Sequence, residues 1–158
     1  MAEIPPLARA MGRIPSGLFI LTAGRGTGAT GLLTSFVQQA GFEPPVVTVA
    51  INKKRGIADL IRQDKAFCLS ILRSGAKKLV THFARGFEPD EPAFEGLRIK
   101  LCGRGIPYLA DAHGHLSCEV VGESGWSDHV VFCGKVIAGA CHDDATPWVH
   151  VRTNGLSY

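Results

Sequence analysis

The sequence predicts a mainly β protein, an antiparallel barrel with a few short helices. Short apolar segments bounded by glycine and proline recur along the 158 residues, and helical spacing appears only in three short stretches. Six or seven strands with so few helices favour a barrel, because closing the sheet removes unpaired edges. The length suits one core, so we expect residues 1–158 to form a single domain.

The expected elements follow from this periodicity. The expected strands cover 17–23, 31–39, 44–52, 66–72, 115–123, 128–141 and 147–152. The segment 44–52 has the strongest strand signal and is expected to be central. Helices are expected after Pro6, from Arg55 and after Ser74, with Ser74 as an N-cap. The aperiodic segment 85–98, rich in proline and carboxylates, is expected to be a surface loop.

Three glycines have the spacing Gly26-x-Gly28-x-x-Gly31, which is the pattern of a dinucleotide-binding turn. Such a turn opens a helix and is followed about 20 residues later by an acidic residue. Here the residues after Gly31 are strand formers, and the segment near residue 50 has no carboxylate. We therefore expect the glycines to turn a hairpin.

Composition limits the possible partners and location. No apolar run is long enough to span a bilayer, and the start lacks a secretory leader, so a soluble cytoplasmic protein without membrane contact is expected. The net charge of +3 is too small to indicate nucleic-acid binding. The five cysteines are scattered and odd in number, and most are expected to be buried free thiols.

Two stretches could bind a ligand. Asn52–Gly56 places three cations between a strand and a helix start, which suits a phosphate but is more often simply a solvated basic loop. Neutral hydrogen-bonding groups interrupt an apolar strand at Thr34, Ser35, Gln38 and Gln39. They could pair with the edge of a flat heterocycle or simply form the polar face of a half-exposed strand.

Histidines offer further candidates. His113-x-His115 has the spacing of a metal pair on a strand, but no third ligand is identifiable, so we expect a polar loop and no metal site. His129 and His82 lie at the ends of expected elements, where active-site residues gather. No nucleophile elbow is present, and a Cys–His hydrolase has no support in the sequence.

Several stretches, taken in order, resemble the flavin reductase-like, FMN-binding split-barrel family. They are "MGRIPSGLFILTA", "TGLLTSFVQQAGFEPPVVTVAINK", "DLIRQDKAFCLSIL", "HFARGFEP", "SDHVVFCGKV" and "VHVRTNGLSY". They are most similar to the flavin reductase domain of flavodiiron proteins, and they extend over nearly the whole chain. The resemblance implies an antiparallel, Greek-key-like split barrel that forms a homodimer, with FMN at or near the dimer interface.

The resemblance also implies site residues. Leu33, Thr34 and Ser35 would lie along the isoalloxazine ring, with Gln38 and Gln39 nearby. Asn52, Lys53 and Arg55 would lie near the phosphate and ribityl chain, and His82 and Phe83 on the helix that closes the pocket. His129 is the expected catalytic residue, which would seat the nicotinamide or balance the charge of the reduced flavin. Many family members have Ser or Thr in the segment after the Pro-Pro strand, where this chain has Lys54, Arg55 and Ile57, so FAD is an alternative to FMN.

The expected function is NAD(P)H-dependent flavin reduction, in which hydride passes from NADH or NADPH to flavin N5. The flavin performs this chemistry, so no acid–base dyad is required of the protein. One alternative is a protein that holds FMN and passes electrons to an acceptor protein without nicotinamide turnover. A second is a split-barrel binding protein without redox activity.

Overall fold

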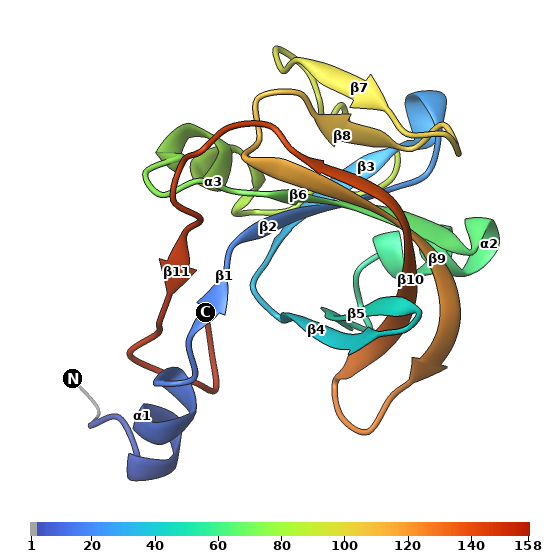
Figure 1. The fold of residues 1–158 in the computed structure, drawn as a ribbon. Helices are drawn as coiled ribbons and strands as arrows, with labels where there is room; N and C mark the ends of the chain where they lie inside the picture. The colour runs from blue at the N-terminus through green and yellow to red at the C-terminus, as the bar shows by residue number, and fades with distance from the viewer. Residues whose placement is uncertain (1–2) are drawn as a thin grey trace.

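The computed structural model describes residues 3–158, which form three short α-helices and eleven strands (Figure 1). The helices are α1 (Pro6–Gly12), α2 (Ile57–Asp64) and α3 (Lys77–Phe83), and the 3-10 turn η1 covers Gly26–Gly28. The strands are β1 (Ser16–Gly17), β2 (Phe19–Ala23), β3 (Thr30–Thr34), β4 (Val37–Phe42), β5 (Pro45–Asn52), β6 (Ala66–Ile71), β7 (Ile99–Leu101), β8 (Pro107–Leu109), β9 (Gly114–Ser124), β10 (His129–Cys141) and β11 (Val149–His150). No helix in the described part of the chain is long and apolar enough to cross a membrane.

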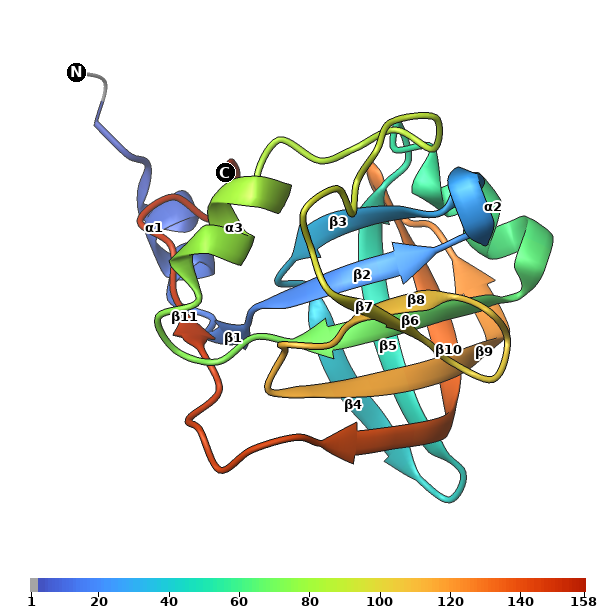
Figure 2. The same ribbon diagram turned by 90° about the horizontal axis from the view of Figure 1, so that it is seen from above.

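Seven strands make one antiparallel sheet in the order β3-β2-β6-β9-β10-β5-β4. The sheet curls over itself, with β3, β2 and β6 on one side and β5 and β4 on the other (Figures 1 and 2). The two edge strands, β3 and β4, are consecutive in the chain and are joined by only Ser35 and Phe36. This confirms the predicted antiparallel split barrel.

The segment 31–39, expected to be one strand, is instead two strands on opposite edges of the sheet. Val37 pairs with Val49, and the Phe36 carbonyl accepts a hydrogen bond from the Ala50 amide at 3.0 Å. These bonds to β5 compete with continued pairing to β2 and take the chain across the barrel in two residues. The expected central strand, β5, therefore lies next to the edge, between β10 and β4.

The glycine-rich turn is a hairpin, as predicted. β2 and β3 pair antiparallel from Phe19 opposite Thr34 to Ala23 opposite Thr30, and η1 lies between them. Gly24 and Gly26 have φ angles of 80° and 57°, a conformation that side-chain-bearing residues rarely adopt. These glycines shape a turn and do not open a helix.

Two large apolar clusters, and a small third one that includes Ala66 and Ile106, stabilise the fold. The first fills the barrel, where fully covered rings such as Phe67 and Phe132 pack against Ile61 of α2. The second lies outside it, under α3 and the segment 85–98, and includes Phe83 and Ala93. Burying one large apolar side chain contributes roughly 1.5–3 kcal/mol. The segment 85–98 is irregular as expected but contributes core residues, so it is more than a surface loop.

Other predictions need correction. α3 begins after Ala76 without a side-chain cap, and Ser74 instead donates its backbone N–H to the Thr146 carbonyl at 2.8 Å. Gly75, with a φ of 84°, separates Ser74 from the helix. The hairpin of β7 and β8 was not predicted, because three-residue strands carry little periodic signal.

Helix α1 forms where expected, but its apolar stripe faces outward. Leu7, Met11 and Ile14 are 66%, 40% and 60% exposed. Ala8 and Gly12 are the buried positions, because their carbonyls accept hydrogen bonds from the backbone amides of the C-terminal segment 152–155. The helix therefore presents an uncovered apolar face.

Candidate functional site

The residues Thr34 and Ser35 end the edge strand β3 and begin the crossing to β4. They are 6% and 5% exposed. Other buried hydroxyls are tied to the backbone: Thr30 donates to the Phe87 carbonyl at 2.9 Å, and Ser70 accepts from the Leu109 amide at 3.0 Å. No comparable bond to Thr34 or Ser35 occurs within residues 3–158, and neither hydroxyl is a fully buried, unsatisfied atom. Both hydroxyls are therefore available to a bound polar group.

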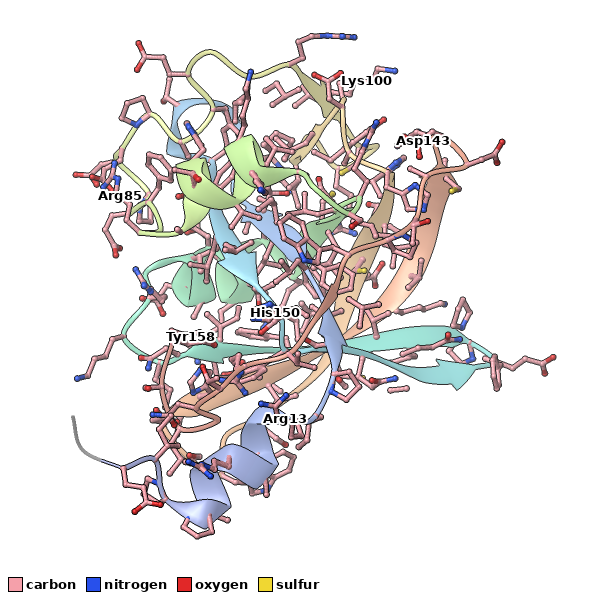
Figure 3. All side chains as sticks on the ribbon, turned by 90° about the vertical axis from the view of Figure 1, so that its left-hand side faces the viewer. Arg13, Arg85, Lys100, Asp143, His150 and Tyr158 are labelled. Atoms are coloured by element: carbon pink, nitrogen blue, oxygen red, sulfur yellow. The ribbon has the colours of Figure 1, made fainter. Side chains whose placement is uncertain are left out.

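Next to them lies a group of rings and one cation, here called the Phe36 cluster: Phe36, His129, Arg152 and Tyr158. The Phe36 ring centroid is 5.5 Å from that of His129 and 6.0 Å from that of Tyr158. The Arg152 guanidinium lies over the Phe36 ring at 4.9 Å. Tyr158 is 86% exposed and folds back toward β5 (Figure 3). A flat ring with a cation on it and a nearby imidazole can stack against an aromatic ligand.

His129 is positioned by the pairing of β10 with β5. It lies opposite Asn52, and the Asp128 carbonyl accepts a hydrogen bond from the Lys53 amide at 2.9 Å. The Nδ1 of His129 lies 2.8 Å from Oδ1 of Asp128. This contact, with a second from the Ser127 hydroxyl, holds the pKa of the Asp128 carboxyl below its ordinary value. An ionised Asp128 orients the ring and leaves Nε2 to face a ligand.

The predicted phosphate residues do not converge. Lys53 extends over the β9–β10 turn, where a Cβ added at Gly125 would lie 3.1 Å from its Nζ. Arg55 turns toward the opposite side, where its Nη1 donates to the Arg85 carbonyl at 3.3 Å and lies against Gly86. The Asn52 side chain accepts a hydrogen bond from the Lys54 amide at 3.0 Å and so shapes the turn. The two cationic groups therefore have different neighbours within residues 3–158.

The two glutamines lie farther along β4. Both are exposed, and Gln38 lies opposite Thr48 on the outer face of the sheet. The Gln38 amide donates to the Gln39 carbonyl at 3.4 Å. Their backbone follows Phe36 directly, but no contact joins either side chain to the Phe36 cluster in the described chain.

The α3 residues have packing roles. Phe83 is fully buried, and a Cβ added at Gly31 would lie 2.8 Å from its ring, so Phe83 supports β3 from beneath and has no surface open to a ligand. His82 Nε2 lies 2.8 Å from the Ala93 carbonyl, and its ring packs against Phe87 at 5.1 Å. His82 also borders a shallow surface hollow with Lys77, Lys78 and Thr81.

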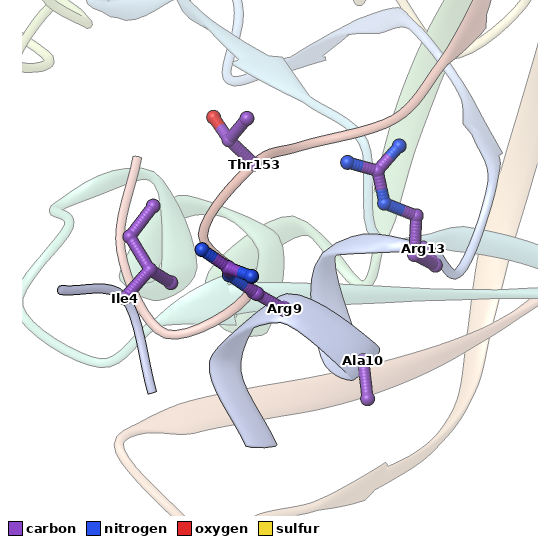
Figure 4. A pocket seen from close by; sticks show the side chains of 5 residues that line it. All are labelled: Ile4, Arg9, Ala10, Arg13 and Thr153. Carbon is purple, nitrogen blue, oxygen red and sulfur yellow. The ribbon is translucent and has the colours of Figure 1, made fainter. Parts of the chain in front are cut away.

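Another hollow, of about 390 Å³, lies between α1 and the C-terminal segment (Figure 4). It is lined by Ile4, Arg9, Ala10, Arg13 and Thr153. None of the sequence-predicted site residues lines it. The hollow shares no lining residue with the Phe36 cluster, although Thr153 of the hollow follows Arg152 of the cluster in the chain.

Three members of the Phe36 cluster were not predicted from the sequence. Phe36 lies in the stretch "TGLLTSFVQQAGFEPPVVTVAINK", and Arg152 and Tyr158 lie in "VHVRTNGLSY", but the sequence predicts no role for these three residues. Their sequence separation hides the contact, since only the folded chain brings residues 36, 129, 152 and 158 together.

The histidine pair also differs from expectation. His115 lies in β9, as the expected strand 115–123 places it and contrary to the polar-loop interpretation, and its Nδ1 is 2.9 Å from Nε2 of His142. His113 turns to a different partner, Asp143. Among residues 3–158 no group of three or more histidine, cysteine or acidic side chains has an arrangement suited to a metal ion.

Comparison with known proteins supports the resemblance. Residues 11–155 match the family model of the flavin reductase like domain. The chain is 39% identical over 154 residues to diflavin flavoprotein A 1 of Synechocystis and 35% identical to putative diflavin flavoprotein A 3 of Nostoc. Each match covers 96% of this chain but only 27% of the relative, so the chain spans about a quarter of the length of these relatives.

Solved structures have the same fold. The NADH:FAD oxidoreductase SgcE6 of Streptomyces globisporus C-1027 superposes with a TM-score of 0.85 at 24% identity, over 96% of this chain and 93% of that one. The styrene monooxygenase flavin reductase of Pseudomonas putida S12 gives a TM-score of 0.78 at 22% identity, over 93% of each chain. From the family match and the curved antiparallel sheet together, the chain belongs to the flavin reductase-like domain family.

Proposed function

We propose that residues 1–158 form one domain that binds FMN beside the Phe36 cluster and catalyses NAD(P)H-dependent flavin reduction. The observation that carries this proposal is the position of two nearly buried hydroxyls, Thr34 and Ser35, next to that cluster in a flavin reductase-like fold. When bound, the flavin supplies the hydride-accepting atom N5. The chain's own task is to orient the two rings and to donate hydrogen bonds.

The donor set fits a flavin. Thr34 and Ser35 offer O–H groups without competing bonds in the described chain. The side chain of Leu33, which packs against the second core cluster, is their apolar neighbour. A heterocycle edge rich in carbonyl and ring nitrogen acceptors matches such donors. Hydrogen bonds from uncharged groups leave the ligand's charge to be balanced by nearby cations.

The phosphate would be held by one cation, and Arg55 is the better candidate. Its guanidinium lies against Gly86, where an added Cβ would lie 2.7 Å from Nη1, and among the described residues its side chain has a hydrogen bond only to the Arg85 carbonyl. Lys53 faces the β9–β10 turn, on the side of His129. Lys53 would therefore lie on the nicotinamide side of the site. The choice between FMN and FAD would depend on the residues beyond Arg55.

His129 would position the nicotinamide. Asp128 holds its ring through Nδ1, and Phe36 packs on it at 5.5 Å, so Nε2 keeps one direction. A fixed donor of this kind reduces the orientational freedom lost when the two ligand rings are brought together. Tyr158 and Arg152 cover the same surface, and their displacement by ligand would open it.

A homodimer is part of the proposal. Apolar side chains on two surfaces are uncovered. Leu7 and Met11 lie on α1 and Ile14 lies just after it, and Val121 and Ile137 lie on β9 and β10. Exposed apolar surface of this extent favours a protein partner, and a second copy of the chain would cover it. Helix α1 projects from the barrel, as an arm reaching such a partner would (Figure 1).

Anaerobic absorption spectroscopy of the protein loaded with FMN tests the proposal. NADH and NADPH are added separately. Bleaching of the bound flavin bands supports reduction and identifies the donor. If the flavin is retained but stays oxidised with both donors, the proposed reductase activity is wrong. The protein would then be an electron carrier that holds FMN and passes electrons to an acceptor protein. Loss of all flavin on gel filtration, with no turnover of added FMN or FAD, would leave a binding protein without redox activity.

A further inference from the structure

The end of β10 brings a thiol, an imidazole and a carboxylate together away from the Phe36 cluster. Cys141 pairs with Gly114 of β9, and the His142 amide donates to the His113 carbonyl at 2.8 Å. The backbone therefore fixes Cys141 and His113 on neighbouring segments. Asp143 follows in a turn closed by the Ala145 amide, which donates to its Oδ1 at 2.9 Å. Figure 3 shows Asp143 far from Tyr158.

The three side chains stand in the order nucleophile, base and orienting acid. The Sγ of Cys141 lies 3.8 Å from Nε2 of His113, and Nδ1 of the same ring lies 2.6 Å from Oδ1 of Asp143. Cys141 is exposed, whereas the His113 side chain is only 11% exposed. A thiol next to an imidazole that a carboxylate orients is the arrangement that activates a nucleophile.

The charges around Asp143 keep it ionised. The His113 contact, the Ala145 N–H and Arg73 together hold the pKa of the Asp143 carboxyl below its ordinary value. Arg73 Nη2 lies 2.7 Å from Oδ2 of Asp143 and also donates to the Asp111 carbonyl at 2.8 Å. A fixed carboxylate stabilises the imidazolium that forms when His113 takes a proton.

We propose that Cys141 is an activated thiol that exchanges with small disulfides, with His113 as its base and Asp143 as the positioning residue. In the resting thiol, S–H donates to the Asp143 carbonyl at 3.2 Å. The proton passes to Nε2 of His113, and the thiolate sulfur attacks one sulfur of R–S–S–R. The S–S bond breaks, and the leaving thiolate takes the proton from His113. The products are Cys141–S–S–R and R–SH, so no other oxidant is needed.

The remaining cysteines provide internal references. Cys68 and Cys118 are buried, and burial raises the pKa of the Cys118 thiol to about 12. Cys133 and Cys102 are partly exposed. Burial acts to raise the pKa of Cys102, but hydrogen bonds with the Ser117 hydroxyl and the Arg104 amide outweigh it and lower that pKa. Cys102 is therefore the rival thiol.

Reaction with oxidised glutathione, followed by peptide mass spectrometry at timed intervals, measures each cysteine separately. We expect Cys141 to form the mixed disulfide about tenfold faster than Cys102 or Cys133. His113→Gln and Asp143→Asn should each slow Cys141 about tenfold and leave the other two thiols unchanged. His150→Gln, a histidine on β11, is the matched control and should change no rate. Cys141→Ser should remove the fast site.

Two results would overturn the proposal. One is a wild-type protein in which Cys141 reacts no faster than Cys102 and Cys133. The other is a Cys141 rate unchanged in folded His113→Gln and Asp143→Asn proteins, with folding followed by circular dichroism. Where either variant does not fold, the wild-type comparison decides. The experiment needs no flavin, so its outcome is independent of the proposed reductase activity.

Discussion

The rings of Phe36 and His129 lie 5.5 Å apart and are inclined by 58°, although one residue ends the crossing from β3 and the other begins β10. The contact exists because β5 lies between these segments: its Ala50 bonds to Phe36, and its Asn52 pairs with His129. Thr34 and Ser35 directly precede Phe36 in the chain, so the crossing that follows β3 lies close to the predicted catalytic residue.

The Thr34 and Ser35 hydroxyls should strengthen flavin binding. Thr34→Ala and Ser35→Ala are each expected to raise the Kd for FMN by about tenfold, the cost of one lost hydrogen bond. Flavin fluorescence titration measures this. Thr48→Ala, whose hydroxyl donates to the Gln38 carbonyl on the outer sheet face, is the control and should leave the Kd unchanged. Equal affinity and equal reduction potential in all three variants would remove Thr34 and Ser35 from the site.

Loss of the His129 imidazole should impair turnover more than flavin binding. His129→Gln is expected to lower kcat/KM for NAD(P)H by roughly tenfold to a hundredfold, because a fixed positioning group is lost. Steady-state oxidation of NADH and NADPH with saturating flavin measures it, with His150→Gln as the control. The same assay is repeated with limiting flavin. A loss seen only with limiting flavin would assign His129 to flavin binding.

Gly31 is expected to tolerate no side chain. Gly31→Ala places a methyl group 2.8 Å from the buried Phe83 ring and should lower the free energy of unfolding by about 1–3 kcal/mol. Gly28→Ala is the matched control, since nothing lies within 4 Å of its added Cβ. Urea denaturation compares the two. Similar unfolding free energies for both variants would contradict the packing of β3 on Phe83.

Acidification should lower the stability of the protein, because His115 next to His142 resists protonation in the folded state. Burial, then the neighbouring His142 and Lys100, lower the pKa of His115 from its ordinary value of 6.5. The unfolded chain then binds a proton more readily than the folded chain, so the contribution is complete above pH 6.5 and is lost as the pH falls through the folded value. The melting temperature of the wild type should drop between about pH 7.5 and 5.

His115→Gln should flatten that part of the pH curve. Asp128 and Asp143 have carboxyl pKa values below 3.8, so they stabilise the fold until the pH falls below 3.8. Their titration therefore lies outside the pH range of His115. An identical drop in wild type and variant would place the titrating group elsewhere.

The uncovered α1 face should support the proposed dimer. Met11→Asp is expected to shift the molecular mass in solution toward the monomer, because a carboxylate in an apolar interface is strongly unfavourable. Light scattering coupled to gel filtration measures the mass. Glu3→Asp, a change outside the apolar face, serves as the control. A wild-type protein that is monomeric at all concentrations would rule the dimer out.

Much of the fold was predictable because its signals are local. The β2–β3 hairpin follows from glycines that permit positive φ, α2 from apolar residues at helical spacing, and the β9–β10 hairpin from two long apolar segments around a turn. The crossing at Ser35–Phe36 was not predictable, since strand propensity is continuous through residues 31–39 and only the competing bonds to β5 divide it.

By itself, the sequence determined the family and the mainly β fold. It also identified Thr34, Ser35 and His129 as candidate site residues, and their roles stay a prediction. Only the tertiary structure decided that Lys53 and Arg55 separate, that Phe83 is buried under β3, and that Cys141, His113 and Asp143 come together. The physical reason is that periodicity and turn chemistry act over a few neighbouring residues. Side-chain direction and contact depend instead on sheet register and curvature, which pair segments far apart in the chain.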